Sequence, residues 1–584
     1  MVFSTSASRI RLAAWALFQS PPKTATINVK RTAARVLKSP SMIDLTHWAG
    51  KVRRRSRAGQ IVIGACSALI LASGCSRLPG LDSRAEGYVQ GFNGAVAGDE
   101  PQAVLAARDI LATGGSAADA VVAAYFTMAV TLPTAASLGA GGVCLVHDKV
   151  KAVEEAIEFT HPTSGPFAGQ VAPLAPRAMQ ALHAKYGHLP WTQLVGPAES
   201  MARLGHPASR AFARAVARAP GRVSAPGMAQ IFADKLGHPV AEGAPVQQVA
   251  LAATLSMLRR QPAQMYSGPL ARRIVADYAR AGTLLTAEGL RGLVPHFRPV
   301  VTVERGNQLA LFPPTPAGVV TAQAWAMLYR EGAWSDFGSD ERANLLAEVS
   351  RRAFADAGRW FATPGGIGDG DSFVSEGRID RLMEGLGRDT AGPAPVMDRA
   401  SAFVEPADQG STSIIALDVF GRAVACAFTM NGTMGAGKLA RETGIVIAAP
   451  PDPEGKGTAA LGLMIVRSDT QQQLEFLGAA TGGAIVPITL ATAAVKTLET
   501  KDTAEAMLAA PRFYHPARPD HVVIEDRADA RAIADRLRKS GHQIVTAPSL
   551  GRANILICPR GFDAERSLCD VRTDRRAFGL AQQN

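Results

Sequence analysis

Residues 409–431 read Gln-Gly-Ser-Thr-Ser-Ile-Ile-Ala-Leu-Asp-Val-Phe-Gly-Arg-Ala-Val-Ala-Cys-Ala-Phe-Thr-Met-Asn. Two strand patterns, at 414–418 and 423–429, are joined by the short connection Val-Phe-Gly-Arg, which is typical of a tight hairpin turn. A glycine and three hydroxyl residues stand directly ahead of the first strand. The stretch therefore predicts a hairpin that carries a small hydroxyl side chain at the start of a buried strand.

This arrangement suits one kind of nucleophile. A serine hydroxyl reacts poorly until a base removes its proton. If the chain is cut between Gly410 and Ser411, Ser411 gains a free α-amine, whose pKa of about 8 lets it act as that base near neutral pH. Nucleophile and base then belong to one residue. Thr412 remains an alternative nucleophile.

Motifs for other chemistries are missing from the sequence. It has no Gly-x-x-x-x-Gly-Lys-Ser/Thr phosphate loop and no Gly-x-Ser-x-Gly elbow. Its eleven histidines form no His-Glu-x-x-His or Cys-x-x-Cys cluster, which argues against a zinc site. We expect neither a metal nor a cofactor.

Elsewhere helical patterns come first, strand patterns follow, and helices return. Helical periodicity covers 101–130, with a break at Gly114-Gly115, and then 177–186, 191–204, 246–260, 341–357 and 376–386. Strand patterns lie at 143–146, 444–448, 463–467, 474–477, 522–525, 543–546 and 555–558, and a helix is expected at 486–497. This order predicts an α+β fold with sheets between helical layers, rather than a parallel βαβ series.

The charge is concentrated at one end of the chain. The net charge is +12, but residues 1–75 hold twelve Lys and Arg residues against one acid, so the other 509 residues carry only +1. Because these 509 residues are nearly neutral, we exclude general electrostatic binding to the phosphate backbone of nucleic acid.

The first 75 residues are typical of a targeting segment. A basic run at 51–57 precedes an apolar run at 61–72, which is short for a permanent membrane span, and then Ser-Gly-Cys75. Leu71 to Cys75 resembles a bacterial lipobox, with Leu71 one place early. We expect an exported, periplasmic lipoprotein anchored to the membrane through Cys75; a plain secretory signal or a retained anchor stays open. Met42 would give a leader of normal length, whereas a start at Met1 leaves a second targeting segment at 9–35 open.

Six cysteines are too few for a disulfide scaffold at this size. Cys144 and Cys426 lie in apolar runs, and we expect them to be buried and inert. Cys558 and Cys569 could pair in an oxidising compartment.

From 97 to 579 the chain resembles the γ-glutamyltransferase (γ-glutamyltranspeptidase) family. The similar segments, in family order, are 114–120, 137–142, 185–187, 198–205, 510–513 and 570–572. The resemblance implies an αββα sandwich of the N-terminal-nucleophile hydrolases, with two stacked, mainly antiparallel sheets. It divides the chain into a large-subunit-like segment (76–410) and a small-subunit-like segment (411–584), and residues 86–410 would fold with 411 onward as one unit.

The same resemblance assigns roles. A gapless match over 411–424 puts Ser411 on the family's nucleophilic threonine. Thr429 falls on the threonine that supports the nucleophile, and Asn431 falls on a substrate-contacting asparagine. Gly482 and Gly483 fall on the glycine pair that forms the oxyanion hole, and cleavage would fall between Gly410 and Ser411.

The sequence departs from the family on the substrate side. Thr160 stands in place of the arginine that binds the glutamyl carboxylate, and Ala459-Ala460 in place of a serine pair. Pro450 and Pro453 stand in place of the glutamine and the aspartate that hold the α-amine of the glutamyl group. Asp452 lies one position away from the place of that aspartate. Without the arginine that Thr160 replaces, the site loses most of its specific binding of the γ-glutamyl carboxylate.

Two functions are compatible with these features. The first is a self-cleaving amidohydrolase or acyltransferase that acts on γ-glutamyl or related acyl amides or peptides, with water or an amino acid as acceptor. The second is a non-catalytic, lipid-anchored binding or scaffold protein on the same fold, which would remain a single chain.

Overall fold

A computed structural model describes residues 94–225, 227–357, 370–392, 410–451, 461–564 and 569–583. All of them lie in the second of two units into which the chain divides, residues 83–584. The predictions for the leader, including Cys75 and Met42, and those for Asp452, Pro453, Ala459 and Ala460 lie outside the described residues.

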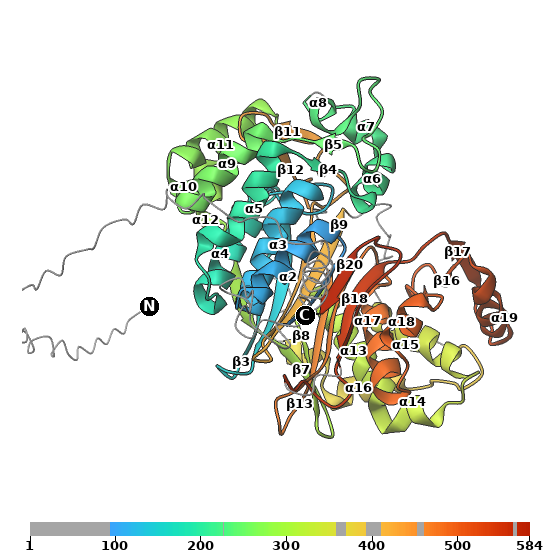
Figure 1. Cartoon of the computed structure of the whole chain (residues 1–584). Helices are drawn as coiled ribbons and strands as arrows, with labels where there is room; N and C mark the ends of the chain where they lie inside the picture. Colours follow the sequence, from blue (N-terminus) through green and yellow to red (C-terminus); the bar gives the residue numbers. More distant parts are fainter. Residues whose placement is uncertain are drawn as a thin grey trace, which may run out of the picture. The chain divides into compact units, whose positions relative to one another are not determined.

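The hairpin predicted from the opening stretch forms the middle of a seven-stranded sheet (Figure 1). Its strands are β9 (Ser411–Asp418) and β10 (Ala423–Thr429). The strand order is β20-β1-β9-β10-β2-β3-β6, and every pairing is antiparallel. The other strands are β1 (Gly94–Gly98), β2 (Gly141–Asp148), β3 (Val153–Phe159), β6 (His296–Pro299) and β20 (Leu580–Gln583).

A second antiparallel sheet has the order β19-β18-β14-β13-β8-β7. Its strands are β7 (Val301–Arg305), β8 (Gln308–Phe312), β13 (Leu461–Ser468), β14 (Leu474–Thr481), β18 (Arg552–Ile557) and β19 (Asp570–Thr573). Smaller sheets pair β11 (Lys438–Ala440) with β12 (Ile445–Ile447), β4 (His206–Pro207) with β5 (Pro245–Val246), and β15 (Phe513–Tyr514) with β16 (Val522–Glu525) and β17 (Ile544–Ala547).

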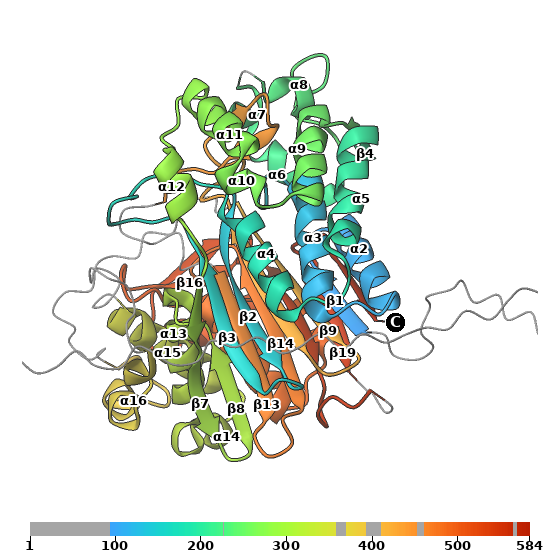
Figure 2. The ribbon, with the colours of Figure 1, turned by 90° about the vertical axis from the view of Figure 1, so that its left-hand side faces the viewer.

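The two large sheets pack face to face, with β9 and β10 against β14 (Figure 2). Alternate residues of each strand enter the layer between the sheets, because successive side chains of a strand point to opposite faces. Ile415 and Leu417 of β9 belong to this buried layer with Leu477 and Ala479 of β14. This core is apolar and fully buried, so it fixes the register of both sheets.

Helices cover the outer face of the seven-stranded sheet. The main ones are α2 (Pro101–Ala112), α3 (Ala117–Thr131), α4 (Leu174–Tyr186), α5 (Trp191–Leu204), α9 (Val249–Arg260) and α11 (Pro269–Arg280). Shorter helices are α6 (Arg210–Ala217), α7 (Pro220–Val223), α8 (Ala229–Phe232), α10 (Gln264–Ser267) and α12 (Ala287–Gly292). The buried helix α3 begins with a capping box, in which Ser116 and Asp119 satisfy each other's backbone N–H groups.

The second sheet is covered by α13 (Pro316–Tyr329), α15 (Arg342–Ala357), α16 (Glu376–Met383), α17 (Val486–Glu499) and α18 (Ala504–Ala509). Two further helices are α14 (Ala333–Asp336) and α19 (Arg531–Lys539). The layers therefore run helix, sheet, sheet, helix, and the predicted sandwich is confirmed (Figures 1 and 2).

The structure corrects one prediction about the cysteines. Cys144 and Cys426 are buried as expected, but they are not inert thiols, because they form a disulfide between β2 and β10. They are direct cross-strand partners with Cα atoms 4.1 Å apart, so the distance does not prevent a bond between them. Cys558 and Cys569 also form a disulfide, as their spacing allowed.

No helix within the described ranges is both long and apolar enough to span a bilayer.

Candidate active site

Ser411 is the first residue of β9, and its direct cross-strand partner is Thr429 of β10. The alternation that buries Ile415 and Leu417 also turns Ser411 toward the layer between the sheets. Its side chain is 1% exposed, and its Oγ has no hydrogen-bond partner among the residues the structure describes. A buried hydroxyl without a partner is costly, and this one is available for another interaction.

Thr412 points to the opposite face of the same sheet. Its Oγ1 donates to Oδ2 of Asp99 at 3.2 Å and lies 3.8 Å from Sδ of Met128 in α3. This hydroxyl is therefore already engaged on the helix side, which favours Ser411 over Thr412 as the candidate nucleophile.

The turn after β10 holds the peptide bond ahead of Ser411 in place. The carbonyl of Gly410 accepts a hydrogen bond from the backbone N–H of Met430 at 2.9 Å. Gly410 has φ +43°, and a Cβ at this position would lie 2.1 Å from the carbonyl oxygen of Gly432. Only glycine fits here, and the bonded carbonyl is polarised toward attack by a neighbouring hydroxyl.

The turn after β10 places Asn431 beside this strand end. Oγ1 of Thr429 accepts from the backbone N–H of Asn431 at 2.9 Å. The Asn431 amide donates to the carbonyl of Ala449 at 2.9 Å and lies 3.2 Å from Nδ1 of His161. Thr429 thus fixes the turn that carries Asn431.

His161 was not singled out in the sequence, although it follows Thr160 directly. Burial lowers the pKa of its imidazole to about 4, so the ring is neutral at physiological pH. Its Nε2 lies 3.0 Å from the carbonyl of Ala172 and donates there, which leaves Nδ1 to accept from Asn431. Thr160 itself contacts Glu158 at 3.3 Å, so neither residue offers a cation to a carboxylate.

Arg552 of β18 links the nucleophile strand to the glycine pair. Its guanidinium donates to the carbonyl oxygen of Ser411 and to Oδ2 of Asp99, the latter at 3.2 Å. A Cβ built on Gly482 would lie 3.5 Å from Nη1 of the same guanidinium. One side chain therefore contacts Ser411 and reaches the backbone of Gly482 on the facing sheet.

Asp99, at the end of β1, is the polar centre of this region. Besides Thr412 and Arg552, it accepts from the backbone N–H of Ser413 at 3.2 Å and from Asn554 at 2.8 Å. Its charge is therefore compensated within the protein. This role could not be predicted from the sequence, because the partners of Asp99 come from two distant strands, β9 and β18.

Gly482 and Gly483 join β14 to α17. Their φ angles are +95° and +111°, a region that side chains strongly disfavour. A Cβ on Gly482 would also lie 3.2 Å from Cα of Gly551. The pair lies just ahead of the N-terminus of α17, where the helix dipole favours negative charge.

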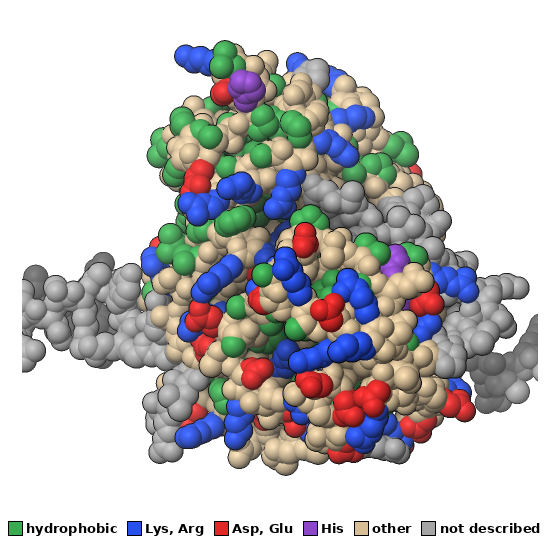
Figure 3. All heavy atoms as spheres, turned by 90° about the vertical axis from the view of Figure 1, so that its right-hand side faces the viewer, with side chains coloured by type: hydrophobic (Ala, Val, Ile, Leu, Met, Phe, Trp, Pro, Cys, Tyr) green, Lys and Arg blue, Asp and Glu red, His purple; other side chains and the backbone are tan. Residues whose placement is uncertain are grey.

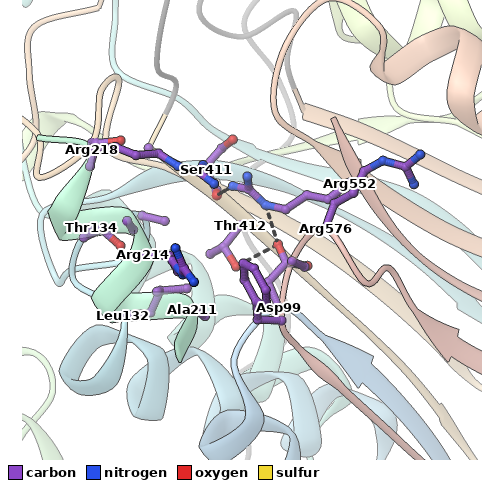
Figure 4. Close-up of a pocket in the computed structure, with 16 residues that line it drawn as sticks. Asp99, Leu132, Thr134, Ala211, Arg214, Arg218, Ser411, Thr412, Arg552 and Arg576 are labelled. Carbon is purple, nitrogen blue, oxygen red and sulfur yellow. Dashed lines mark hydrogen bonds and ion pairs between the residues drawn. The ribbon is translucent and has the colours of Figure 1, made fainter. Parts of the chain in front are cut away.

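A cavity opens beside Ser411 (Figure 4). Gly410, Ser411 and Thr412 line it together with Asp99 and Arg552, and α6 closes it from the other side with Arg214 and Arg218. Thr429, Asn431 and the glycine pair do not line this cavity. The described residues contain no group of three or more His, Cys, Asp or Glu side chains arranged to hold a metal.

The family model for gamma-glutamyltranspeptidase matches residues 103–450 and 461–580. The chain belongs to this family. The glutathione hydrolase proenzyme of Escherichia coli K12 is 25% identical over 531 residues, which cover 81% of this chain and 90% of that protein. The glutathione hydrolase proenzyme of Pseudomonas aeruginosa is 28% identical over 399 residues, covering 61% of this chain and 67% of that protein.

A crystal structure of cephalosporin acylase from Bacillus halodurans has the same fold, with a TM-score of 0.71 and 21% identity, covering 87% of this chain and 98% of that one. The predicted family and fold are thus confirmed, and the protein is an N-terminal-nucleophile amidohydrolase or transpeptidase of this family.

Proposed function

We propose that this protein is made as a single-chain precursor, cuts itself between Gly410 and Ser411, and then transfers acyl groups from amides to water or an amine. The observation that carries the proposal is the buried, unpartnered hydroxyl of Ser411 next to a glycine carbonyl that already accepts a hydrogen bond. The proenzyme names of the two bacterial relatives support a precursor.

In the cleavage step, Oγ of Ser411 attacks the carbonyl carbon of Gly410. The carbon–nitrogen bond breaks, the hydroxyl proton ends on the departing nitrogen, and an ester joins Gly410 to Ser411. Water hydrolyses that ester and leaves a carboxylate on Gly410 and a free α-amine on Ser411. This amine is the base that activates the hydroxyl in later turnovers.

In turnover, the activated hydroxyl attacks the acyl carbon of an amide, and the amine leaves with the proton. Gly482 and Gly483 supply backbone N–H groups to the tetrahedral oxyanion, aided by the N-terminus of α17. Thr429 positions the turn, and Asn431 contacts substrate. Water or an amino acid then releases the acyl group from Ser411.

We further propose that the mature protein is exported to the periplasm. The two disulfides support an oxidising compartment. The leader pattern supports export, and the lipobox resemblance supports a lipid anchor at Cys75. The acyl donor is a γ-glutamyl or related acyl amide, and the departure at Thr160 argues for a related donor.

The test is release of 4-nitroaniline from a panel of acyl anilides by the purified protein and by Ser411→Ala. We expect the wild type to hydrolyse at least one anilide and Ser411→Ala to hydrolyse none. If Thr412→Ala is inactive while Ser411→Ala remains active, the nucleophile is Thr412 and not Ser411. If the wild-type chain stays intact and hydrolyses no anilide, the result would favour the non-catalytic binding protein instead.

A further inference from the structure

The cavity beside Ser411 is strongly unbalanced in charge. Four arginines line it, and Asp99 is the one carboxylate among the residues that line it. Arg552 is paired with Asp99 at 3.2 Å. The guanidinium of Arg576 is turned away from the cavity (Figure 4), and its Nε donates to Glu525 at 2.7 Å.

Of the four arginines that line the cavity, this leaves Arg214 and Arg218. They lie one turn apart at the end of α6, so their side chains share one face of the helix, and both are directed toward the cavity (Figure 4). Within the described ranges neither guanidinium group has a hydrogen bond or an ion pair. Arg214 adds a weak attraction to Glu242, whose carboxylate is already bonded to Arg210 at 2.9 Å.

The cavity lies on the acyl side of the nucleophile. In the ester that forms during cleavage, the carbonyl carbon of Gly410 is bound to Oγ of Ser411. In turnover, the acyl carbon of the substrate is bound to the same oxygen. Gly410 and Ser411 both line the cavity. The rest of a bound acyl group therefore extends from Ser411 toward α6.

From this geometry we propose that Arg214 and Arg218 are specificity residues that bind a carboxylate at the far end of the acyl group. The inference rests on the function proposed above and names its substrate class: amides of a dicarboxylic acid that carry no ammonium group. The two arginines replace the missing cation at Thr160 from a different element of the fold.

The absence of an ammonium group follows from Asp99. It accepts hydrogen bonds from Thr412, Ser413, Asn554 and Arg552, so it has little capacity left for a substrate amine. A zwitterionic glutamyl group would bring its ammonium into a site with uncompensated positive charge, and such like-charge contact weakens binding. On the side of the molecule drawn in Figure 3, basic side chains lie above and below a hollow, with some acidic side chains among them.

Three anilides that differ in one group test the inference. They are the γ-glutamyl 4-nitroanilide, its deamino analogue with the carboxylate retained, and the carboxamide of that analogue, which is neutral. We expect kcat/KM to be about 10- to 100-fold higher for the anionic analogue than for the carboxamide, the usual range for a charge-assisted hydrogen bond. Added salt should reduce this preference, because both arginines are at exposed positions.

The variant Arg214→Gln/Arg218→Gln should reduce the preference to about threefold or less by raising KM for the anionic analogue, with cleavage before Ser411 unchanged. Arg214→Lys/Arg218→Lys should restore part of it. The matched control is Arg210→Gln, on the same helix but paired with Glu242 outside the cavity, which should keep the full preference.

Equal or better turnover of the carboxamide by the wild type, or a preference that survives the double glutamine variant, would overturn this inference while leaving the proposed function standing. An uncleaved chain that turns over none of the three anilides would overturn the proposed function, and the inference with it.

Discussion

The disulfide between Cys144 and Cys426 makes a prediction that joins the fold to the proposed cleavage. Cys144 lies before residue 411 and Cys426 after it. If the chain is cut between Gly410 and Ser411, this bond holds the two pieces together covalently. Cys558 and Cys569 both lie in the second piece, so their bond cannot.

The effect on stability follows from the loop that each bond closes. For a sequence separation of 282, the chain-entropy model gives about 5.6 kcal/mol in the uncleaved chain, above the usual range of about 0–5 kcal/mol. For a separation of 11, it gives about 2.8 kcal/mol. Removing the first bond should therefore destabilise the precursor more than removing the second.

The assay is a denaturing gel run with and without reductant. Wild-type protein should run as one species without reductant and as two with it. Cys144→Ala/Cys426→Ala should give two pieces in both lanes, whereas the matched control Cys558→Ala/Cys569→Ala should behave like the wild type. Urea unfolding of uncleavable Ser411→Ala forms gives the two stability losses.

Two separate pieces from oxidised wild-type protein, with no free thiol at Cys144 or Cys426, would refute the reasoning. A larger stability loss from removing Cys558–Cys569 than from removing Cys144–Cys426 would refute the loop argument alone.

Three further predictions concern the site and its surroundings. Gly482→Ala should lower kcat by about 100- to 1,000-fold in steady-state assays, because the Cβ adds strain at φ +95° and crowds Gly551; an active Gly482→Ala would contradict the oxyanion assignment. Thr429→Ala should lower kcat/KM with less effect on stability, since it removes the acceptor of the Asn431 N–H; unchanged kinetics would remove Thr429 from the site. Burial raises the pKa of Glu100 from 4.5 to about 7, so the folded state binds the proton more tightly and stability should fall by about 3 kcal/mol as pH rises from about 4.5 through 7. Urea unfolding at pH 5 and pH 8 measures that loss, which Glu100→Gln should remove; an equal loss in this variant would assign it to other groups.

The fold followed from the sequence where the patterns were local. The pattern at 414–429 predicts a hairpin because two strand-like apolar runs flank a short turn, and the structure has β9 and β10 there. The hairpin of β7 and β8 was not predicted. Its signal was present, since Gly306-Asn307 separates two alternating runs in the manner of a two-residue turn.

The parts of the site that could not be predicted depend on long-range packing. Asp99 and Arg552 are 453 residues apart in sequence, and no spacing rule connects them. Neither the Cys144–Cys426 bond nor the arginines of α6 near Ser411 could be read from periodicity. Apolar runs alone suggested buried cysteines, and only the register of β2 with β10 makes them partners.

Intact-mass measurement and N-terminal sequencing of the reduced, mature protein most directly test whether Ser411 becomes the head of a new chain. The account predicts a smaller piece that begins at Ser411 with a free amine, in the wild type and in Ser411→Thr, which keeps a β-hydroxyl group, and a single uncut chain in Ser411→Ala. A piece that begins at any other residue, or cleavage that persists in Ser411→Ala, would contradict it.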